Sequence, residues 1–187
     1  YSVLVDTFGN VPYSQALDLN KYPLPVYDDA KVIYKDLISR LAANATILKA
    51  NAAFPNFDSA DIIYGGNAAS NLKWAKFANS LIIRLAVNIS DVELGYATTQ
   101  AQTALAAGVL ASNADNTKLV YLTTAGNQNP LYADLVVSKR DDFIPAEPFV
   151  AAMDAMGGDP RMSKFFTNGT SPAPTLPAGR KFIGGTY

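Results

Sequence analysis

The sequence has no cysteine and no histidine. Because a cysteine nucleophile, a serine–histidine dyad and the usual zinc sites need a thiolate or an imidazole, none of them can be built from this chain. Disulfide bonds are excluded as well, although a secreted bacterial protein can do without them. We expect no metal site and no cofactor.

Glutamate is scarce, since only Glu93 and Glu147 occur. A pair of catalytic carboxylates could still come from the fourteen aspartates, but no spacing in the sequence marks a pair. A glycoside hydrolase that uses paired aspartates therefore stays an alternative. It would need two carboxyl groups about 5 to 9.5 Å apart across one cleft.

The chain also has no excess charge and no long hydrophobic run. Lysine and arginine total 15 against 16 acidic residues, which gives no positive field for nucleic acid. The stretch 77–90 is interrupted by Arg84 and is shorter than the roughly 20 apolar residues that span a bilayer. A length of 187 residues with 49% hydrophobic residues predicts one globular domain with a real core.

The apolar periodicity predicts a mainly α-helical chain. We expect helices over 29–49, 72–93, 98–108 and 147–156, with Asp28 or Asp29 capping the first and Thr98 the third. A short strand is possible over 120–122, and 112–140 is the longest predicted loop. One apolar stripe should pack against another in the core; the first is Trp74, Phe77, Leu81 and Leu85, and the second is Ile33, Leu37 and Leu41.

Three local motifs have both a functional and a structural interpretation. Gly65-Gly66-Asn67 could cradle a phosphate, but it lacks the remaining P-loop residues, so an ordinary loop is favoured. Arg84, within an apolar helix, is best explained by a structural ion pair. The Arg140-Asp141-Asp142 run could ligate a metal, yet adjacent aspartates usually cap or turn the chain.

Four separated motifs together resemble the SusD/RagB family of nutrient-binding outer-membrane lipoproteins, in particular its SusD-like branch. They are DTFGNVPYS at 6–14; DIIYGG at 61–66 with KWAKFANSLIIRLA at 73–86; NPLY at 129–132 with RDDF at 140–143; and DPR at 159–161 with Gly184-Gly185. Their order and spacing cover nearly the whole chain. The resemblance implies tetratricopeptide-like helical hairpins with long ligand-facing loops.

The resemblance also implies a function. Such proteins bind oligosaccharides, or peptides in some members, without cleaving them. They are anchored to the outer membrane by an N-terminal lipid and cover a SusC-like TonB-dependent transporter. Because the lipidated cysteine and an initiator methionine are missing, we expect residues 1–187 to be a single SusD-like domain that is incomplete at both ends. A purely protein-binding helical scaffold is a further alternative.

The candidate ligand residues lie in the predicted loop over 112–140. Aromatic faces stack on sugar rings and amides bridge hydroxyl groups, which favours Asn127, Gln128, Asn129 and Tyr132, followed by Tyr121. The competing interpretation is that residues 129–132 are structural, because they belong to the family pattern. The sequence leaves both interpretations open.

Overall fold

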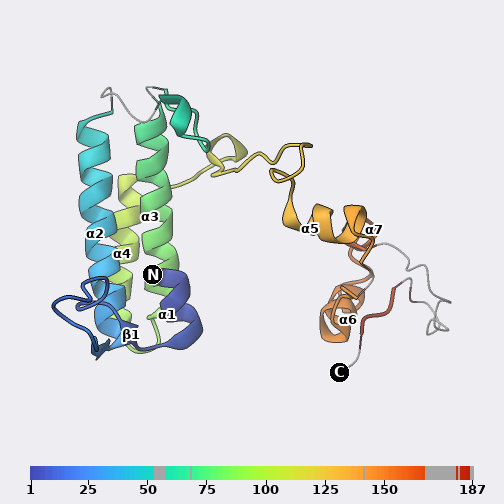
Figure 1. Cartoon of the computed structure of the whole chain (residues 1–187), viewed down its shortest axis with the longest axis horizontal. Helices are drawn as coiled ribbons and strands as arrows, with labels where there is room; N and C mark the ends of the chain where they lie inside the picture. The colour runs from blue at the N-terminus through green and yellow to red at the C-terminus, as the bar shows by residue number, and fades with distance from the viewer. Residues whose placement is uncertain (53–57, 68, 141, 167–179, 181, 186–187) are drawn as a thin grey trace. The chain divides into compact units, whose positions relative to one another are not determined.

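The computed structural model describes residues 1–52, 58–67, 69–140, 142–166, 180 and 182–185 (Figure 1). The mainly helical class predicted from the sequence is confirmed. The chain divides into two compact units, Tyr1–Val120 and Tyr121–Tyr187, and a single domain over 1–187 stays a prediction. Among the described residues, none of the helices combines the length and apolar character that crossing a bilayer requires.

Three helices make up most of the first unit: α2 (Ala30–Ala50), α3 (Ser70–Asn88) and α4 (Leu94–Ala107). They run alongside one another, and α3 packs against both α2 and α4 (Figure 1). Ile33 and Ile38 of α2 and Leu85 of α3 are completely buried at the centre of this bundle. Sequential antiparallel helices of this kind are the helical hairpins that the sequence predicts.

The start of α2 agrees with its prediction to within one residue. The Asp29 carboxylate caps the helix by accepting hydrogen bonds from the N–H groups of Lys31 at 2.8 Å and Val32 at 3.3 Å. Asn10 Oδ1 accepts from the N–H of Ala30 at 3.0 Å. The cap therefore also holds the N-terminal segment against the helix.

The N-terminal segment contains α1 (Ser2–Phe8) and a two-stranded antiparallel sheet of β1 (Val11–Pro12) and β2 (Tyr27–Asp28). Asp6 of α1 forms an ion pair with Arg84 of α3 at 3.3 Å and accepts a hydrogen bond from the Tyr34 hydroxyl. The structural ion pair predicted for Arg84 is confirmed. It ties α1 to the C-terminal part of α3.

Helix α3 ends earlier than predicted, at Asn88 instead of residue 93. The Ser90 hydroxyl donates to the carbonyl of Val87 at 2.8 Å, and the Ser90 N–H donates to the same carbonyl at 3.2 Å. These bonds replace the regular helical ladder in the last turn. The chain then turns at residues 89–93.

The turn makes α4 begin at Leu94, so the prediction that Thr98 caps this helix is wrong. The buried small residues Ala97 and Ala104 face the core, which requires helix from one turn before Thr98. Glu93, just before α4, pairs with Lys31 at 3.2 Å and Lys35 at 3.1 Å on α2. Lys35 first, and then Lys31, hold the pKa of Glu93 below its usual value.

The buried face of α3 also differs from the predicted stripe. Leu85 is buried as expected, but Trp74, Phe77 and Leu81 are only half-buried. The centre of the buried face lies one residue position, or about 100° around the helix axis, from the centre of the predicted stripe. Its buried residues are Ser70, Asn71, Ala75, Ala78, Asn79, Ile82, Leu85 and Ala86. Because alanines occupy this face, the helices approach closely and the large aromatic residues move to the rim.

After α4 the chain continues along α3 toward the start of that helix, through the short 3-10 helix η2 (Asn113–Asp115). Asp115 pairs with Lys76 of α3 at 2.9 Å and accepts from the N–H of Ala111 at 3.0 Å. The strand predicted over 120–122 is absent from the described residues. Val120 and Tyr121 have exposed side chains, and the N–H of Leu122 bonds within a local turn instead of with a partner strand.

The first helix of the second unit is α5 (Pro130–Tyr132), which continues into the π-helix η3 (Ala133–Val137). Together with η2, these elements correct the prediction of a loop region over 112–140. Helix α6 (Glu147–Ala155) confirms the fourth predicted helix, and α7 (Met162–Phe165) was not predicted. Val150, Met153 and Met162 form the core of this unit.

Arg180 connects the end of the chain with α6. Its guanidinium contacts Glu147 Oε1 and Asp154 Oδ2, both at 2.5 Å, and Glu147 Oε2 accepts from the N–H of Gly184 at 2.7 Å. Ala146 and Gly185 form a parallel bridge beside these contacts. Residues 53–57, 68, 141 and 167–179 lie outside the described residues.

Candidate ligand-binding site

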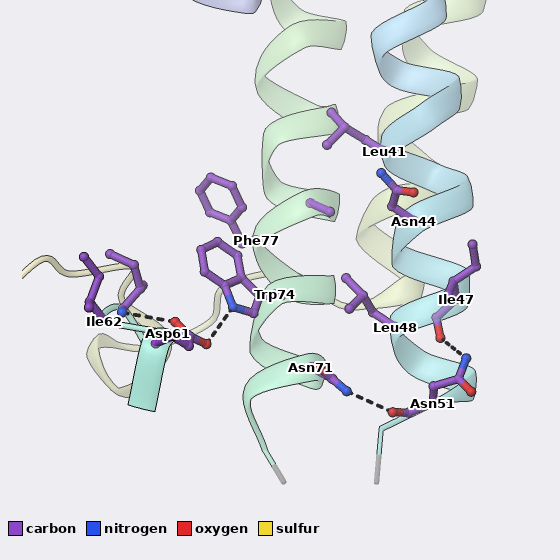
Figure 2. A pocket seen from close by; sticks show the side chains of 13 residues that line it. Leu41, Asn44, Ile47, Leu48, Asn51, Asp61, Ile62, Asn71, Trp74 and Phe77 are labelled. Carbon is purple, nitrogen blue, oxygen red and sulfur yellow. Dashed lines mark hydrogen bonds between the residues drawn. The ribbon is translucent and has the colours of Figure 1, made fainter. Parts of the chain in front are cut away.

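A recess of about 920 Å³ opens between α2, α3 and the segment that precedes α3. Figure 2 shows side chains from α2 on one side, and Trp74 and Phe77 projecting from α3 toward Asp61 and Ile62 on the other. The residues that line it are Leu41, Asn44, Ile47, Leu48, Asn51, Ala60, Asp61, Ile62, Ile63, Asn71, Trp74, Phe77 and Ala78. This volume and this mainly apolar wall are typical of small-ligand pockets.

Aromatic rings form one wall of the recess. The rings of Trp74 and Phe77 meet edge to face with centroids 5.6 Å apart, and Tyr64 meets the other side of Trp74 at 5.0 Å. The Tyr64 hydroxyl donates to the carbonyl of Asp115 at 3.0 Å, which fixes this outer ring. The indole is thus held between two neighbours and cannot easily change orientation.

Asp61 is the one carboxylate among the lining residues, and its oxygens are already engaged. Oδ1 accepts from the N–H groups of Tyr64 at 3.0 Å and Ile63 at 3.1 Å, and Oδ2 accepts from Trp74 Nε1 at 2.9 Å. Donation from the Tyr64 N–H, followed by the Trp74 indole and the Ile63 and Gly66 N–H groups, holds the pKa of Asp61 below its usual value. The carboxylate therefore acts as a structural anion.

The glycine pair after this segment forms a tight turn. Gly66 has φ +60°, and a Cβ atom there would lie 1.8 Å from the carbonyl oxygen of Asp58. The N–H of Asn67 bonds to Ser70 Oγ at 3.0 Å, and Asn67 Oδ1 accepts from the N–H of Ala69 at 2.9 Å. These contacts agree with an ordinary structural loop at the start of α3, the interpretation that the sequence favours.

The five residues predicted to bind ligand lie in the second unit. Asn127 belongs to a turn in which its carbonyl accepts from the N–H of Leu122 at 2.8 Å and its N–H donates to Thr124 at 3.0 Å. The turn therefore places Leu122, the residue after Tyr121, beside Asn127. The Asn127 side chain is exposed and makes no hydrogen bond to the described residues, whereas Gln128 Nε2 donates to the carbonyl of Thr123 at 2.7 Å.

Asn129 and Tyr132 have different positions in α5. Asn129 Oδ1 caps this short helix by accepting from the N–H of Leu131 at 2.9 Å, and Pro130 occupies the first turn. Tyr132 is 47% exposed and Tyr121 is 46% exposed. The two tyrosine rings and the Asn127 amide are therefore accessible, and the amides of Gln128 and Asn129 also support the local backbone. Ligand binding by all five stays a prediction.

The recess itself was not predicted, because the sequence analysis assigned Trp74 and Phe77 to the core. The signal that could have shown it is the second set of periodic residues on α3, Ala75, Ala78 and Ala86. Alanines at helical spacing indicate the face of closest helix contact, so they place the neighbouring aromatic residues at its edge.

Within the described residues the structure has no cluster of three potential metal ligands, and Asp141 of the run at 140–142 lies outside them. Two carboxylates do come together, Glu147 and Asp154, but both contact the Arg180 guanidinium. Arg140 forms a two-point ion pair with Asp142, at 2.9 and 2.5 Å, and Asp142 is thereby used structurally. The nearby Arg140 guanidinium holds the pKa of Asp142 below its usual value.

Comparisons with known proteins agree with the motifs in the sequence. A SusD-like family model, described as "Starch-binding associating with outer membrane", matches residues 1–179. The chain belongs to the SusD-like family. The resemblance inferred from the four motifs is thus confirmed. A comparison with curated protein sequences gives no match.

Solved SusD-like structures share the fold. A SusD homologue from Bacteroides uniformis is 31% identical, with a TM-score of 0.71 over 84% of this chain and 32% of that chain. A chitin-binding protein is 30% identical, with a TM-score of 0.66 over 86% of this chain and 32% of its own. A chitin-binding SusD homologue from Flavobacterium johnsoniae is 26% identical, with a TM-score of 0.68 over 86% and 32%. The chain spans about a third of the length of these relatives.

Proposed function

We propose that this protein captures oligosaccharide nutrients at the outer surface of the outer membrane and does not cleave them. One observation carries the proposal: residues 1–179 match the SusD-like family model, whose description names starch binding and association with the outer membrane. The similarity to chitin-binding relatives supports a glycan over a peptide as the ligand. The captured ligand would pass to a SusC-like TonB-dependent transporter, with a lipid anchor holding the protein at the cell surface.

Chemistry within the recess supports binding over hydrolysis. A glycosidase needs one carboxylic acid and one carboxylate on opposite sides of the bond that breaks. The recess has a single carboxylate, Asp61, whose oxygens accept backbone and indole hydrogen bonds that favour the ionised form. Such a group neither donates a proton readily nor has a partner among the lining residues.

The second unit supplies a candidate contact surface through Asn127, Gln128, Asn129, Tyr132 and Tyr121. Within this set we expect the exposed rings of Tyr121 and Tyr132 to stack on sugar faces and the Asn127 amide to bridge hydroxyl groups. Gln128 and Asn129 would contribute through whichever of their amide atoms are not bonded to Thr123 and Leu131. The loop therefore combines both elements of sugar recognition.

The experiment is calorimetry on the full-length protein with a panel of chito-, malto- and cello-oligosaccharides and with peptides of matched size, followed by chromatography of each mixture. Saturable glycan binding with no shortened products supports the proposal. Efficient hydrolysis by the pure protein, or binding of peptides alone, overturns it.

Point variants then test the loop. Asn127→Ala should weaken glycan binding about tenfold through the loss of one or two hydrogen bonds, whereas Thr124→Ala in the same turn should leave it unchanged. Tyr132→Ala should weaken binding more than Tyr132→Phe, because phenylalanine keeps the stacking face. Undiminished affinity in both Asn127→Ala and Tyr132→Ala would place the ligand elsewhere.

A further inference from the structure

The recess between α2 and α3 lies in the first unit and contains none of the five predicted ligand residues. Its apolar surface comes from Leu41, Ile47 and Leu48 on α2 and from Trp74 and Phe77 on α3. With about 920 Å³ it can hold one or more sugar units. Its chemistry therefore bears on what kind of ligand unit can enter.

Most polar groups on the wall are already hydrogen-bonded. Trp74 Nε1 donates to Asp61, Asn51 Nδ2 donates to the carbonyl of Ile47 at 2.8 Å, and Asn71 Nδ2 donates to the carbonyl of Asn51 at 2.9 Å (Figure 2). Asn44 differs, because its exposed amide bonds to none of the described residues. Figure 2 shows this amide on α2 between Leu41 and Ile47. The recess thus offers apolar walls and an amide that remains available to a ligand.

This combination suits some sugars better than others. A fully hydroxylated glucose unit would bury several hydroxyl groups against a wall with few donors or acceptors to spare, and each unpaired group opposes binding. An N-acetylated amino sugar carries a methyl group that the apolar wall can cover, and an amide that Asn44 can hydrogen-bond. A de-acetylated amino sugar would instead bring an ammonium group to the apolar wall.

We propose that this recess binds an N-acetylated amino-sugar unit of the captured oligosaccharide. The acetyl methyl group packs against the wall formed by Trp74 and Phe77, and Asn44 hydrogen-bonds the acetamido group. The inference rests on the proposed glycan capture and adds a second, unit-specific contact to it. It makes the acetyl group, and not the sugar backbone, the feature that this surface recognises.

The first test compares ligands on the full-length protein. Tetra-N-acetylchitotetraose, its fully de-acetylated counterpart and cellotetraose share the same linkage geometry and differ at the 2-position. Calorimetry should show binding of the acetylated sugar at least about tenfold tighter than of either analogue, a difference that one good contact can produce. Equal affinity for all three would overturn the proposal even if glycan capture stands.

The second test uses variants with a matched control. Asn44→Ala removes an exposed amide without opening the core. It should weaken binding of the acetylated sugar about tenfold and leave the affinity for cellotetraose unchanged. Ser39→Ala, an exposed polar truncation on the same helix, should change neither. Phe77→Leu keeps an apolar residue but loses the ring, and it should also weaken binding of the acetylated sugar.

The indole gives a readout of occupancy, because Trp74 lines the recess. The ligand-dependent fluorescence change of the full-length protein should be smaller in Trp74→Phe, and the difference between the two proteins is the Trp74 signal. If Asn44→Ala and Phe77→Leu still bind glycan fully and no Trp74 signal is seen, the proposed function stands, but the proposal that the recess binds the sugar is overturned. Binding of apolar peptides alone, weakened by the same variants, would overturn the sugar assignment and the proposed glycan function together.

Discussion

Trp74 Nε1 donates a hydrogen bond to Asp61 Oδ2 over 2.9 Å and so joins α3 to the segment that precedes it. Both residues line the recess, and the same carboxylate organises the N–H groups of the next turn. One contact thus sets the orientation of the aromatic wall and the path of the backbone opposite it. A ligand pocket whose walls are fixed in this way needs little rearrangement to bind.

Replacing Trp74 should separate these two contributions. Trp74→Phe keeps a ring beside Tyr64 and Phe77 but removes the donor to a charged acceptor, and should lower the free energy of unfolding by about 1.5 kcal/mol. Trp74→Ala also removes the packing and should cost about 3 kcal/mol, the low end for aromatic truncation because the ring is half-buried. Urea unfolding followed by circular dichroism measures both. Equal losses in the two variants would show that the hydrogen bond, and not the ring, provides the stability.

Truncation of the buried leucine of α3 should destabilise the bundle more than truncation of an exposed one. Leu85 is 0% exposed, so Leu85→Ala leaves a cavity and should lower the free energy of unfolding by about 3 kcal/mol. Leu105 of α4 is 61% exposed, and Leu105→Ala should cost less than about 0.5 kcal/mol. Denaturant midpoints measured under identical conditions compare the two. A similar loss in both would contradict the assignment of the core.

The glycine pair gives a matched test of the turn beside the recess. Gly65 and Gly66 both have positive φ, at +76° and +60°, so alanine at either position should cost about 1 kcal/mol in backbone strain. Only at Gly66 would the new Cβ also meet backbone atoms, those of Asp58, within 2.2 Å. Gly66→Ala should therefore lower the thermal midpoint clearly more than Gly65→Ala. Equal midpoints would mean that the Asp58 backbone moves away freely.

The carboxylate of Asp159 should titrate unusually low. Bonds from the Arg161 guanidinium, and then from the Arg161 N–H, lower the pKa of Asp159 to about 2 from its ordinary 3.8. Because the folded pKa lies below the unfolded one, the pair stabilises the folded state above pH 3.8, and this contribution is lost as the pH falls toward 2. Carbon-detected NMR titration should place the midpoint near 2.

The control for this titration is Arg161→Gln, which removes the cation and should return the Asp159 pKa toward 3.8. Since the Arg161 side chain is largely exposed, 1 M salt should move the wild-type midpoint in the same direction. An unchanged midpoint in Arg161→Gln would assign the low pKa to the backbone instead.

Much of the fold could be predicted from the sequence because periodicity and capping residues act locally. Asp29 caps α2 as its position suggests, and α6 begins at Glu147 with Pro148 in its first turn. The errors occur where two signals of similar strength compete. The pattern over residues 72–93 predicts one apolar helix, but the Ser90 hydroxyl donates to the carbonyl of Val87 and the helix ends at Asn88. Asn129 and Pro130 begin α5, but the polar residues around them favoured the prediction of a loop.

The recess could not be predicted, since it depends on contacts between segments far apart in the sequence. Whether Trp74 lies in the core or at its edge depends on a rotation of α3 by one residue, and both faces carry apolar side chains at helical spacing. The Asn44 amide acquires its role only when α2 and α3 are side by side. Local patterns determine which helices form, and the packing between helices determines which residues are left for a ligand.

The order of the bundle helices has a consequence for how the chain acquires its structure. Helices α2, α3 and α4 pack on their immediate neighbours in sequence, so the contacts within the bundle form across the connections 51–69 and 89–93 and need no more distant part of the chain. Chains with such local topology fold quickly, in the microsecond to millisecond range. The bundle can therefore assemble quickly once the chain is released to fold, and ion pairs such as Lys35–Glu93 then join helices that are already packed.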